Sequence, residues 1–219
     1  MGTIPCVLEI DSMKYIFVHG MGQNASSWDK TIACLNNGIQ PICLELSDFF
    51  TEESCDYQNL YSRFCDYCNQ RSEPLNLCGL SLGAVLVLNY AIEFPERIKS
   101  LVLIAPQYDM PKFLLKVQNV VFRLMPESQF KNIGLTKKDF LSLTNSMMDL
   151  DFTDKLVKIS CPVLILCGKQ DHVNKKVALK ISENILNVQF CMIDHSGHEV
   201  NVDNPKELAH ILNEFICQE

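Results

Sequence analysis

Short apolar segments, each long enough for one buried strand, alternate along the chain with longer segments whose apolar residues recur at helical spacing. Residues 57–70 show the helical pattern, with apolar side chains at positions 57, 60, 61, 64 and 68. This alternation predicts an α/β fold with a mostly parallel central sheet and helices on both faces. The expected strands cover residues 4–10, 13–18, 42–46, 75–78, 100–105, 163–167 and 188–193, and further helices cover residues 26–35, 84–94 and the segment from Pro205, after Asn204 as N-cap.

Residues 107–160 interrupt this alternation, because they hold no clear strand. An apolar stripe over residues 111–124 predicts one helix, and Thr136 with Asp139 resembles a capping box that opens a second helix reaching Met148. We therefore expect an α/β core made of residues 1–106 and 161–219, and a helical cap or lid insertion over residues 107–160. The cap is expected over the carboxyl edge of the sheet, where open α/β sheets bind ligands.

Composition and charge narrow the class of protein. The 219 residues are 47% hydrophobic, which is enough for the core of one domain. The net charge of −7 argues against a nucleic-acid partner. No apolar run approaches the length of about 18 residues that spans a membrane, and residues 1–10 lack the pattern of a signal peptide. We expect a cytoplasmic protein without stable membrane insertion.

The eleven cysteines are an odd number in a long chain without an export signal, so a disulfide scaffold is not expected. Most of them lie in apolar segments and are expected to be small, reduced core residues. Cys65 and Cys68 form a C-x-x-C pair, but this pair lies inside the helical pattern of residues 57–70, and no second pair accompanies it. Neither a metal nor an organic cofactor is expected.

The segment Gly79-Leu80-Ser81-Leu82-Gly83 reads G-x-S-x-G and lies between a predicted strand and a predicted helix. On a sharp strand-to-helix turn the serine hydroxyl is held clear of the sheet, and the glycines permit close packing of the helix on the strand. A serine hydroxyl becomes a nucleophile when an imidazole takes its proton and a carboxylate orients that imidazole. Asp171 and His198 follow later predicted strands, in the chain order Ser, Asp, His of one triad arrangement.

Four segments together resemble the α/β-hydrolase fold family. The resemblance covers nearly the whole chain except residues 107–160, which vary in that family. Only about one strand precedes the predicted strand that ends at His19, so the sheet is expected to be slightly reduced on its N-terminal side. The four matching segments are His19-Gly20-Met21-Gly22, Gly79 to Gly83, Gly168-x-x-Asp171, and Gly197-His198 followed by Asn204-Pro205.

The resemblance implies a role for five residues. Ser81 is the expected nucleophile, His198 the general base and then acid, and Asp171 the orienting carboxylate. The backbone N–H groups of Met21 and Leu82 are the expected oxyanion hole, which stabilises the negative charge that develops on the substrate oxygen.

Other residues compete for these roles. His195 lies three residues before His198, and Asp109 follows an earlier predicted strand, where some hydrolases of this fold carry their acid. Family position favours His198 over His195 and Asp171 over Asp109. Trp28 is expected in the core behind the oxyanion loop. The residues expected to have no part in proton transfer are His19, which shapes the oxyanion loop, and His172, Asp194 and His210.

The serine nucleophile implies acyl chemistry on a small-molecule substrate: carboxylic esters, with lactones, thioesters and monoacylglycerols as further options. Two other functions stay open. One is a carbon–carbon lyase or hydrolase of the menaquinone-synthase or ring-fission type, enzymes that resemble this family and often bind carboxylate substrates through arginines of the cap. This function is disfavoured because Arg123 is the single arginine of residues 107–160. The other is a non-enzymatic small-molecule receptor on the same fold. The cap is rich in apolar residues, so short-to-medium acyl esters are expected to be cleaved better than acetate-sized or charged ones.

Overall fold

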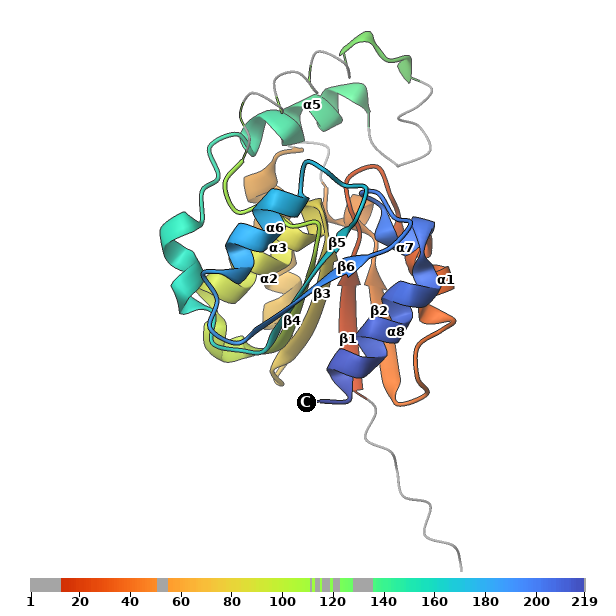
Figure 1. Cartoon of the computed structure of the whole chain (residues 1–219). Coiled ribbons are helices and arrows are strands. Elements are labelled where there is room, and N and C mark those ends of the chain that lie inside the picture. Colours follow the sequence, from red (N-terminus) through yellow and green to blue (C-terminus); the bar gives the residue numbers. More distant parts are fainter. Residues whose placement is uncertain are drawn as a thin grey trace, which may run out of the picture.

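The computed structural model describes residues 13–50, 55–110, 112, 115, 119, 123–127 and 136–218. Within these residues the strands form one six-stranded, wholly parallel sheet, which confirms the predicted α/β class (Figure 1). The expected strand over residues 4–10 lies outside the described residues. The sheet order is β2-β1-β3-β4-β5-β6, with β1 Met13–Val18, β2 Ile39–Leu44, β3 Leu75–Leu80, β4 Ile98–Ile104, β5 Val163–Gly168 and β6 Val188–Ile193.

Helices cover both faces of the sheet, as the alternating pattern predicts. One face packs against α2 (Tyr57–Asn69), α3 (Leu82–Glu93) and α6 (Lys175–Ser182), and the other against α1 (Asp29–Ile32), α7 (Val200–Asp203) and α8 (Pro205–Ile216) (Figure 1). Each face has its own buried apolar cluster. The side chains of β3 alternate between them: Leu77 belongs to the first cluster, and Cys78 and Leu80 to the second.

The order of the strands places the loops that matter at one edge of the sheet. The chain runs from β1 outward to β2, returns to β3 on the other side of β1, and then continues to β6. The strand order therefore reverses beside β1, the kind of position where open α/β sheets bind ligands at their carboxyl ends. Val18 pairs with Gly79 and Gly168 with Ile193, so these strands end level with each other.

Several predicted elements differ from the structure by one or two residues at an end, and two differ further. The helix expected over residues 26–35 is a 3-10 turn, η1 (Ala25–Trp28), followed by the single turn of α1. The strand expected over residues 42–46 begins earlier, because Ile39 pairs with Met13 at the start of β1. It also ends earlier, since Leu46 opens a second 3-10 turn, η2 (Leu46–Phe49). By contrast, α8 begins at Pro205 as predicted, with Asn204 accepting from the Glu207 N–H.

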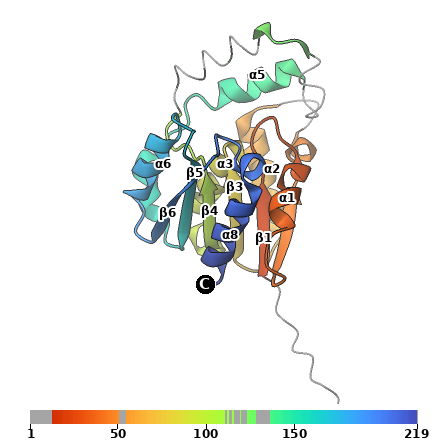
Figure 2. The ribbon, with the colours of Figure 1, turned by 45° about the vertical axis from the view of Figure 1, so that its right-hand side comes forward.

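The described part of residues 107–160 includes α5 (Lys137–Ser146), which lies across the carboxyl edge of the sheet (Figures 1 and 2). Its capping box forms as predicted: Thr136 caps the helix, and the Asp139 carboxylate accepts from the Thr136 N–H at 2.9 Å. Two further 3-10 turns, η3 (Pro95–Arg97) and η6 (Thr153–Lys158), follow α3 and α5. Most of the helix expected over residues 111–124 lies outside the described residues. No helix in the described part of the chain has the length and apolar character needed to cross a membrane.

Candidate active site

Ser81 lies on the turn between β3 and α3, at the carboxyl edge of the sheet. Its backbone has φ 54° and ψ −113°, and such a conformation costs a non-glycine residue about 1–3 kcal/mol. The turn is held from both sides. The Ser81 N–H donates to the Ile104 carbonyl of β4 at 2.9 Å, and the Ser81 carbonyl accepts from the Val85 N–H of α3 at 3.0 Å. The hydroxyl therefore sits on a backbone that its neighbours hold in one conformation.

The glycines beside Ser81 allow the helix to approach the strands. A Cβ atom on Gly83 would lie 2.2 Å from the Val18 carbonyl oxygen at the end of β1. A Cβ atom on Gly79 would lie 2.4 Å from the carbonyl oxygen of Gly83 itself. Both neighbours are backbone atoms, which cannot move aside as a flexible side chain can. The close packing of α3 against β1 and β3 therefore requires glycine at both positions.

Asp171 follows β5 and His198 follows β6, and the structure brings their side chains together. The distance from His198 Nδ1 to Asp171 Oδ2 is 2.8 Å. The Asp171 side chain is 5% exposed and that of His198 is 43% exposed, so a buried acid contacts a base that solvent or substrate can reach. The two loops also touch through their backbones. A Cβ atom on Gly168 would lie 2.0 Å from the Gly197 carbonyl oxygen, so this approach requires glycine as well.

The surroundings of Asp171 favour its ionised form. Burial acts to raise its pKa, but hydrogen bonds from His198 and Asn174 outweigh burial and lower the pKa below the ordinary value of 3.8. The Asn174 backbone N–H donates to Oδ1 at 3.1 Å, and Asn174 Nδ2 donates to Oδ2 at 2.7 Å. An ionised carboxylate only accepts hydrogen bonds, so His198 Nδ1 carries the proton between the pair. The other ring nitrogen, Nε2, is then available to accept a proton.

The competing acid and base lie elsewhere. Asp109 is exposed and forms an isolated β-bridge with Asp151. His195 is also exposed and has a positive φ of 54°, which belongs to the turn after β6. Asp194 forms an ion pair with Lys169 at the surface. The structure therefore pairs Asp171 with His198 and leaves Asp109 and His195 outside the pair.

Two further predicted residues lie at the base of the loop after β1. His19 is buried, with Nδ1 2.8 Å from the Gly20 carbonyl oxygen and Nε2 accepting from the Leu46 N–H at 3.1 Å. These contacts shape the loop, as expected, and keep both ring nitrogens occupied. Trp28 is fully buried and packs on Phe17 of β1, with 5.2 Å between the ring centroids. His172 and His210 lie on the surface, His210 Nε2 being 3.5 Å from a Glu214 carboxylate oxygen.

A cavity of about 400 Å³ joins the predicted residues. Ser81, Asp171 and His198 line it, and so do Met21 and Leu82. Leu82 is the first residue of α3, where a backbone N–H has no acceptor within the helix. Apart from Asp171 and His198, the described lining carries no ionisable group; its remaining side chains are Val85, Gln107, Met110, Leu115, Thr144, Met147, Val173 and Asn174.

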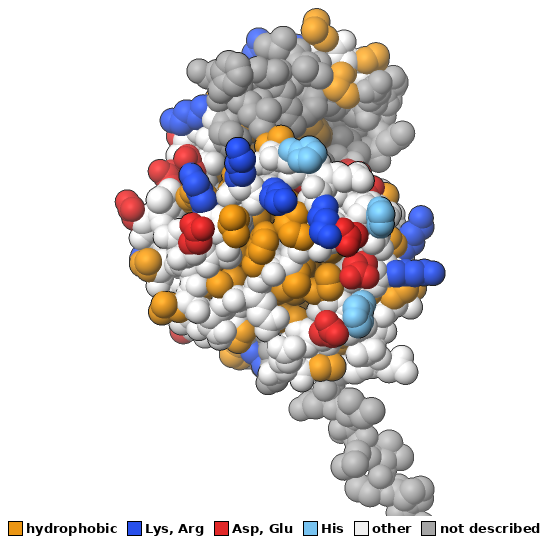
Figure 3. Space-filling model, viewed as in Figure 1, with side chains coloured by type: hydrophobic (Ala, Val, Ile, Leu, Met, Phe, Trp, Pro, Cys, Tyr) orange, Lys and Arg blue, Asp and Glu red, His pale blue; other side chains and the backbone are white. Residues whose placement is uncertain are grey.

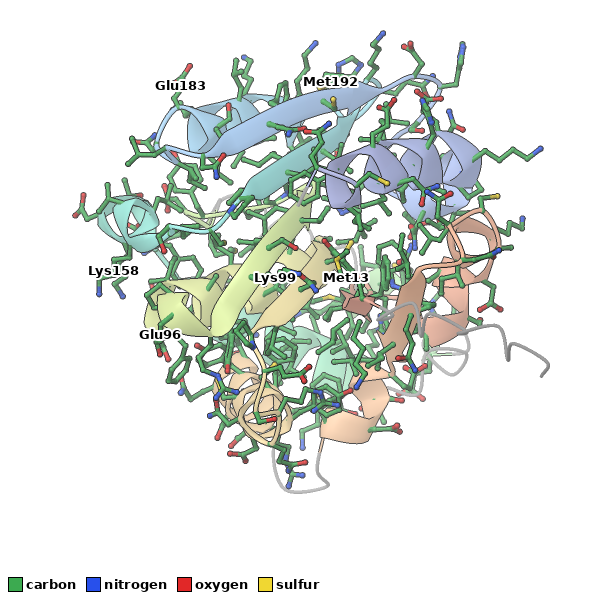
Figure 4. The ribbon with its side chains drawn as sticks, turned by 90° about the horizontal axis from the view of Figure 1, so that it is seen from below. Met13, Glu96, Lys99, Lys158, Glu183 and Met192 are labelled. Atoms are coloured by element: carbon green, nitrogen blue, oxygen red, sulfur yellow. The ribbon has the colours of Figure 1, made fainter. Side chains whose placement is uncertain are left out.

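A larger hollow lies at the opposite end of the sheet. It measures about 510 Å³ and is lined near the amino ends of β1 and β3 by Lys14, Arg71 and Glu73 among others. Figure 4 views this end of the molecule, where Met13 marks the start of β1 and Lys99 lies near the start of β4. None of the predicted site residues lines this hollow. The smaller cavity is therefore the candidate site, because Ser81, Asp171 and His198 line it.

Four buried or partly buried amides near the site were not singled out by the sequence. Asn174 contacts Asp171, and Gln107 lines the cavity and donates to Asn174 Oδ1. Gln23 and Asn201 exchange hydrogen bonds of 3.1 and 3.2 Å, which tie the loop after β1 to α7. Asparagine and glutamine are ordinary residues of loops and helix starts, so the sequence alone does not single out these four. Only the three-dimensional contacts separate them.

Half of the described cysteines are core residues. Of the ten in the described residues, Cys34 and Cys217 are exposed, and Cys43, Cys65 and Cys191 are half-buried; the other five are buried. Burial raises the pKa of Cys65 to about 11 and that of Cys68 to about 12, so neither is a reactive thiolate at neutral pH. In the described part of the chain, no group of three or more His, Cys, Asp or Glu side chains is placed to hold a metal ion.

Known proteins share both the sequence pattern and the fold. The sequence model of the alpha/beta hydrolase family matches residues 15–211, which is most of the chain. The chain belongs to the alpha/beta hydrolase family. Among solved structures, this hydrolase is similar to an esterase from Exiguobacterium antarcticum, with a TM-score of 0.81 and 18% sequence identity over 94% of this chain and 92% of that one. At this identity the likeness concerns the fold.

Two curated relatives of this hydrolase act on esters by name. The pimeloyl-(acyl-carrier protein) methyl ester esterase of Legionella pneumophila (strain Corby) is 24% identical over 93% of this chain and 95% of the relative. The human monoacylglycerol lipase ABHD6 is 20% identical over 92% of this chain and 74% of the relative. Together with the family, these matches support an ester-cleaving hydrolase.

Proposed function

We propose that this hydrolase cleaves carboxylic esters through a Ser81–His198–Asp171 triad and an acyl-enzyme. The observation that carries the proposal is the 2.8 Å contact between His198 and the buried Asp171, in the same cavity as a serine on a strained turn. The ester-cleaving relatives support the reaction type.

Each residue takes a role that its surroundings suit. His198 Nε2 accepts the Ser81 hydroxyl proton while the serine oxygen attacks the ester carbonyl. Asp171 stabilises the imidazolium that forms and keeps its Nδ1 proton in place. The backbone N–H groups of Met21 and Leu82 donate to the negatively charged oxygen of the tetrahedral intermediate. His198 then protonates the leaving alcohol, and a water activated by the same imidazole releases the acid.

The acyl group proposed for this site is uncharged and of short to medium length. Residues 107–160 act as the cap, and their described members Met110, Leu115 and Met147 add apolar surface to the cavity. No lysine or arginine is among the described lining residues. Several basic side chains lie instead across the outer surface that Figure 3 shows. An acyl chain with a charge inside the cavity would lose its hydration without gaining a partner.

The test is hydrolysis of p-nitrophenyl esters from acetate to octanoate by the wild-type chain, Ser81→Ala and a matched control, Ser182→Ala. Ser182 is a serine of α6 whose hydroxyl donates to the Leu179 carbonyl at the surface. We expect Ser81→Ala to lose activity by at least about 10³-fold while Ser182→Ala keeps it, with the wild-type rates highest beyond acetate. Retained turnover in pure Ser81→Ala would exclude the triad. Rates that fall steadily from acetate to octanoate would exclude the proposed acyl preference.

A fluorophosphonate probe separates the enzyme from a receptor on the same fold. An activated serine reacts covalently with such a probe, whereas an unactivated hydroxyl does not. We expect labelling of the wild-type chain and of Ser182→Ala, and none of Ser81→Ala. A wild-type chain that neither hydrolyses the esters nor reacts with the probe would favour the receptor.

A further inference from the structure

Asn174 makes more contacts with the candidate triad than its sequence position suggests. Its backbone N–H and its side-chain Nδ2 each donate to a different oxygen of Asp171, at 3.1 and 2.7 Å. Nδ2 also lies 3.0 Å from His198 Nδ1. Nδ2 of Asn174 and Nδ1 of His198 therefore both point at Asp171 Oδ2, and the amide fills the space beside the imidazole. A buried amide in this position limits how far either ring or carboxylate can turn.

The usual structural reason for an asparagine at this place does not apply. Asn174 is the N-cap residue of α6, and asparagine is favoured there because its side chain accepts from a free N–H of the first turn. Here the Asn174 side chain makes no such capping bond. Its amide is directed at Asp171 instead. The helix forgoes a contribution of about 1 kcal/mol that the cap would supply, which points to a role in the site.

Gln107 fixes which way the Asn174 amide faces. Asn174 Nδ2 must face the carboxylate, so Oδ1 faces away and needs a donor. Gln107 Nε2 supplies that donor, since it hydrogen-bonds to Asn174 Oδ1. Gln107 Oε1 is buried and has no hydrogen-bond partner among the described residues. The side chain of Gln107 is therefore oriented by its donor bond to Asn174 and not by its own carbonyl. Gln107 also lines the cavity, at the start of the proposed cap.

We infer that Asn174 is a positioning residue for Asp171 and His198, and that Gln107 acts through Asn174 as the second member of a relay from the cavity wall to the triad acid. The inference rests on the proposed function. The relay holds the Asp171–His198 pair in the geometry that leaves Nε2 facing the cavity. It also places a second side-chain donor, beside His198, on Asp171 Oδ2.

The first test replaces the amide by groups of the same size. In Asn174→Leu the donor is lost, so we expect kcat for a short p-nitrophenyl ester to fall about ten- to hundredfold, with KM changed far less. In Asn174→Asp a second carboxyl group lies beside Asp171 and His198, and like charges so close favour proton uptake. We expect the acid limb of its kcat/KM profile to move to higher pH, further than in Asn174→Leu. A packing role would not distinguish these two variants.

The matched control is Asn184→Leu. Asn184 is an exposed asparagine just after the same helix, and its Nδ2 donates to the Lys180 carbonyl at 2.7 Å. We expect its kcat and pH profile to equal those of the wild type. Circular dichroism melting of every variant identifies any that fails to fold. Should Asn174→Leu be such a case, Asn174→Asp, which has the shape of the native residue, carries the test through its pH profile.

The second test asks whether Gln107 acts through Asn174. We expect Gln107→Leu to lower kcat about threefold to tenfold in the wild-type background and to have no further effect in the Asn174→Leu background. A double-mutant cycle measures this coupling. The rate of fluorophosphonate labelling of Ser81 gives the same comparison without an ester substrate.

The outcomes separate the relay from the function on which it rests. An inactive wild-type chain, or an active Ser81→Ala, contradicts the proposed function. An active wild-type chain and an inactive Ser81→Ala, together with wild-type kcat and pH profiles in both Asn174 variants, overturn the relay alone. Equal effects of Gln107→Leu in both backgrounds would remove Gln107 from it.

Discussion

Ser81 and the Asp171–His198 pair line the same cavity, but different interactions hold them in place. Ser81 belongs to one continuous strand–turn–helix segment, and backbone hydrogen bonds and close glycine contacts fix it. Asp171 and His198 come from two loops whose backbones meet at Gly168 and Gly197, and side-chain hydrogen bonds join the acid to the base. Backbone contacts therefore place Ser81, the backbone half of the site, whereas the pair, its side-chain half, depends in addition on the identity and charge of a few side chains.

This difference decides how each half responds to change. A backbone-held turn resists substitution of neighbouring side chains but fails when a Cβ atom replaces hydrogen at a crowded glycine. A side-chain-held pair tolerates small backbone shifts but fails when a donor or acceptor is removed, because a buried polar group is left unpaired. Each half can therefore be broken without touching the other.

The largest expected effect breaks the side-chain half. In Asp171→Asn one acceptor oxygen becomes an NH2 donor, so the amide can hold His198 in the wrong tautomer, with no proton on Nδ1. We expect kcat for a p-nitrophenyl ester to fall about 10³- to 10⁴-fold. Asp109→Asn is the control, since Asp109 is exposed and does not line the cavity. Equal losses in the two variants, or a loss in Asp109→Asn alone, would transfer the acid role away from Asp171.

The second effect breaks the backbone half. In Gly83→Ala the new Cβ atom would lie 2.2 Å from the Val18 carbonyl oxygen, so α3 must move away from β1. We expect the free energy of unfolding to fall by about 3 kcal/mol, measured by urea denaturation. Gly38→Ala is the matched control, because nothing lies within 4 Å of the Cβ position there. A stable and fully active Gly83→Ala would mean that the turn at Ser81 does not depend on this contact.

The third effect uses acid to weaken the side-chain half, and the comparison with Asp171→Asn isolates the contribution of Asp171. Hydrogen bonds lower the pKa of Asp171 below 3.8 in the folded chain, so its ionised form stabilises the fold above about pH 4. That contribution is lost as the pH falls through the lowered pKa. We expect Asp171→Asn to be less stable than the wild type at pH 5, and the difference to narrow by pH 3. Urea denaturation at both values measures it. A gap that widens towards pH 3 would contradict the lowered pKa.

The contrast between the two halves also explains what the sequence can reveal. The turn at Ser81 can be recognised in the sequence because crowded backbone contacts permit only glycine at Gly79 and Gly83, and this constraint leaves a fixed motif. The strand pattern is visible because β3, β4 and β5 are buried on both faces and read as apolar runs. The contacts of Asn174 cannot be predicted from the sequence, because an asparagine before a helix ordinarily indicates an N-cap.

The predicted elements that differ from the structure do so where tertiary contacts override local pattern. The segment over residues 26–35 has a helical apolar pattern, yet it forms η1 and the single turn of α1, because Trp28 is drawn into the core against Phe17. β2 begins at Ile39 because Ile39 pairs with Met13. The apolar pattern of residues 42–46 gives no sign of this pairing. The pairing register depends on both strands, so the sequence of one strand predicts it only weakly.

The smallest expected effect concerns Met147, which belongs to neither half. It follows α5, is 5% exposed as a residue, and lines the cavity. Met147→Ala removes side-chain atoms from the apolar wall, so we expect the preferred acyl chain to lengthen by about two carbons. We also expect kcat/KM for the longer ester to rise about threefold, measured over the p-nitrophenyl series. Met148→Ala is the control, because the neighbouring methionine does not line the cavity. An equal loss of kcat/KM on all esters, acetate included, would show instead that Met147 supports Ser81 or the Asp171–His198 pair. The proposed cap would then not set the acyl length.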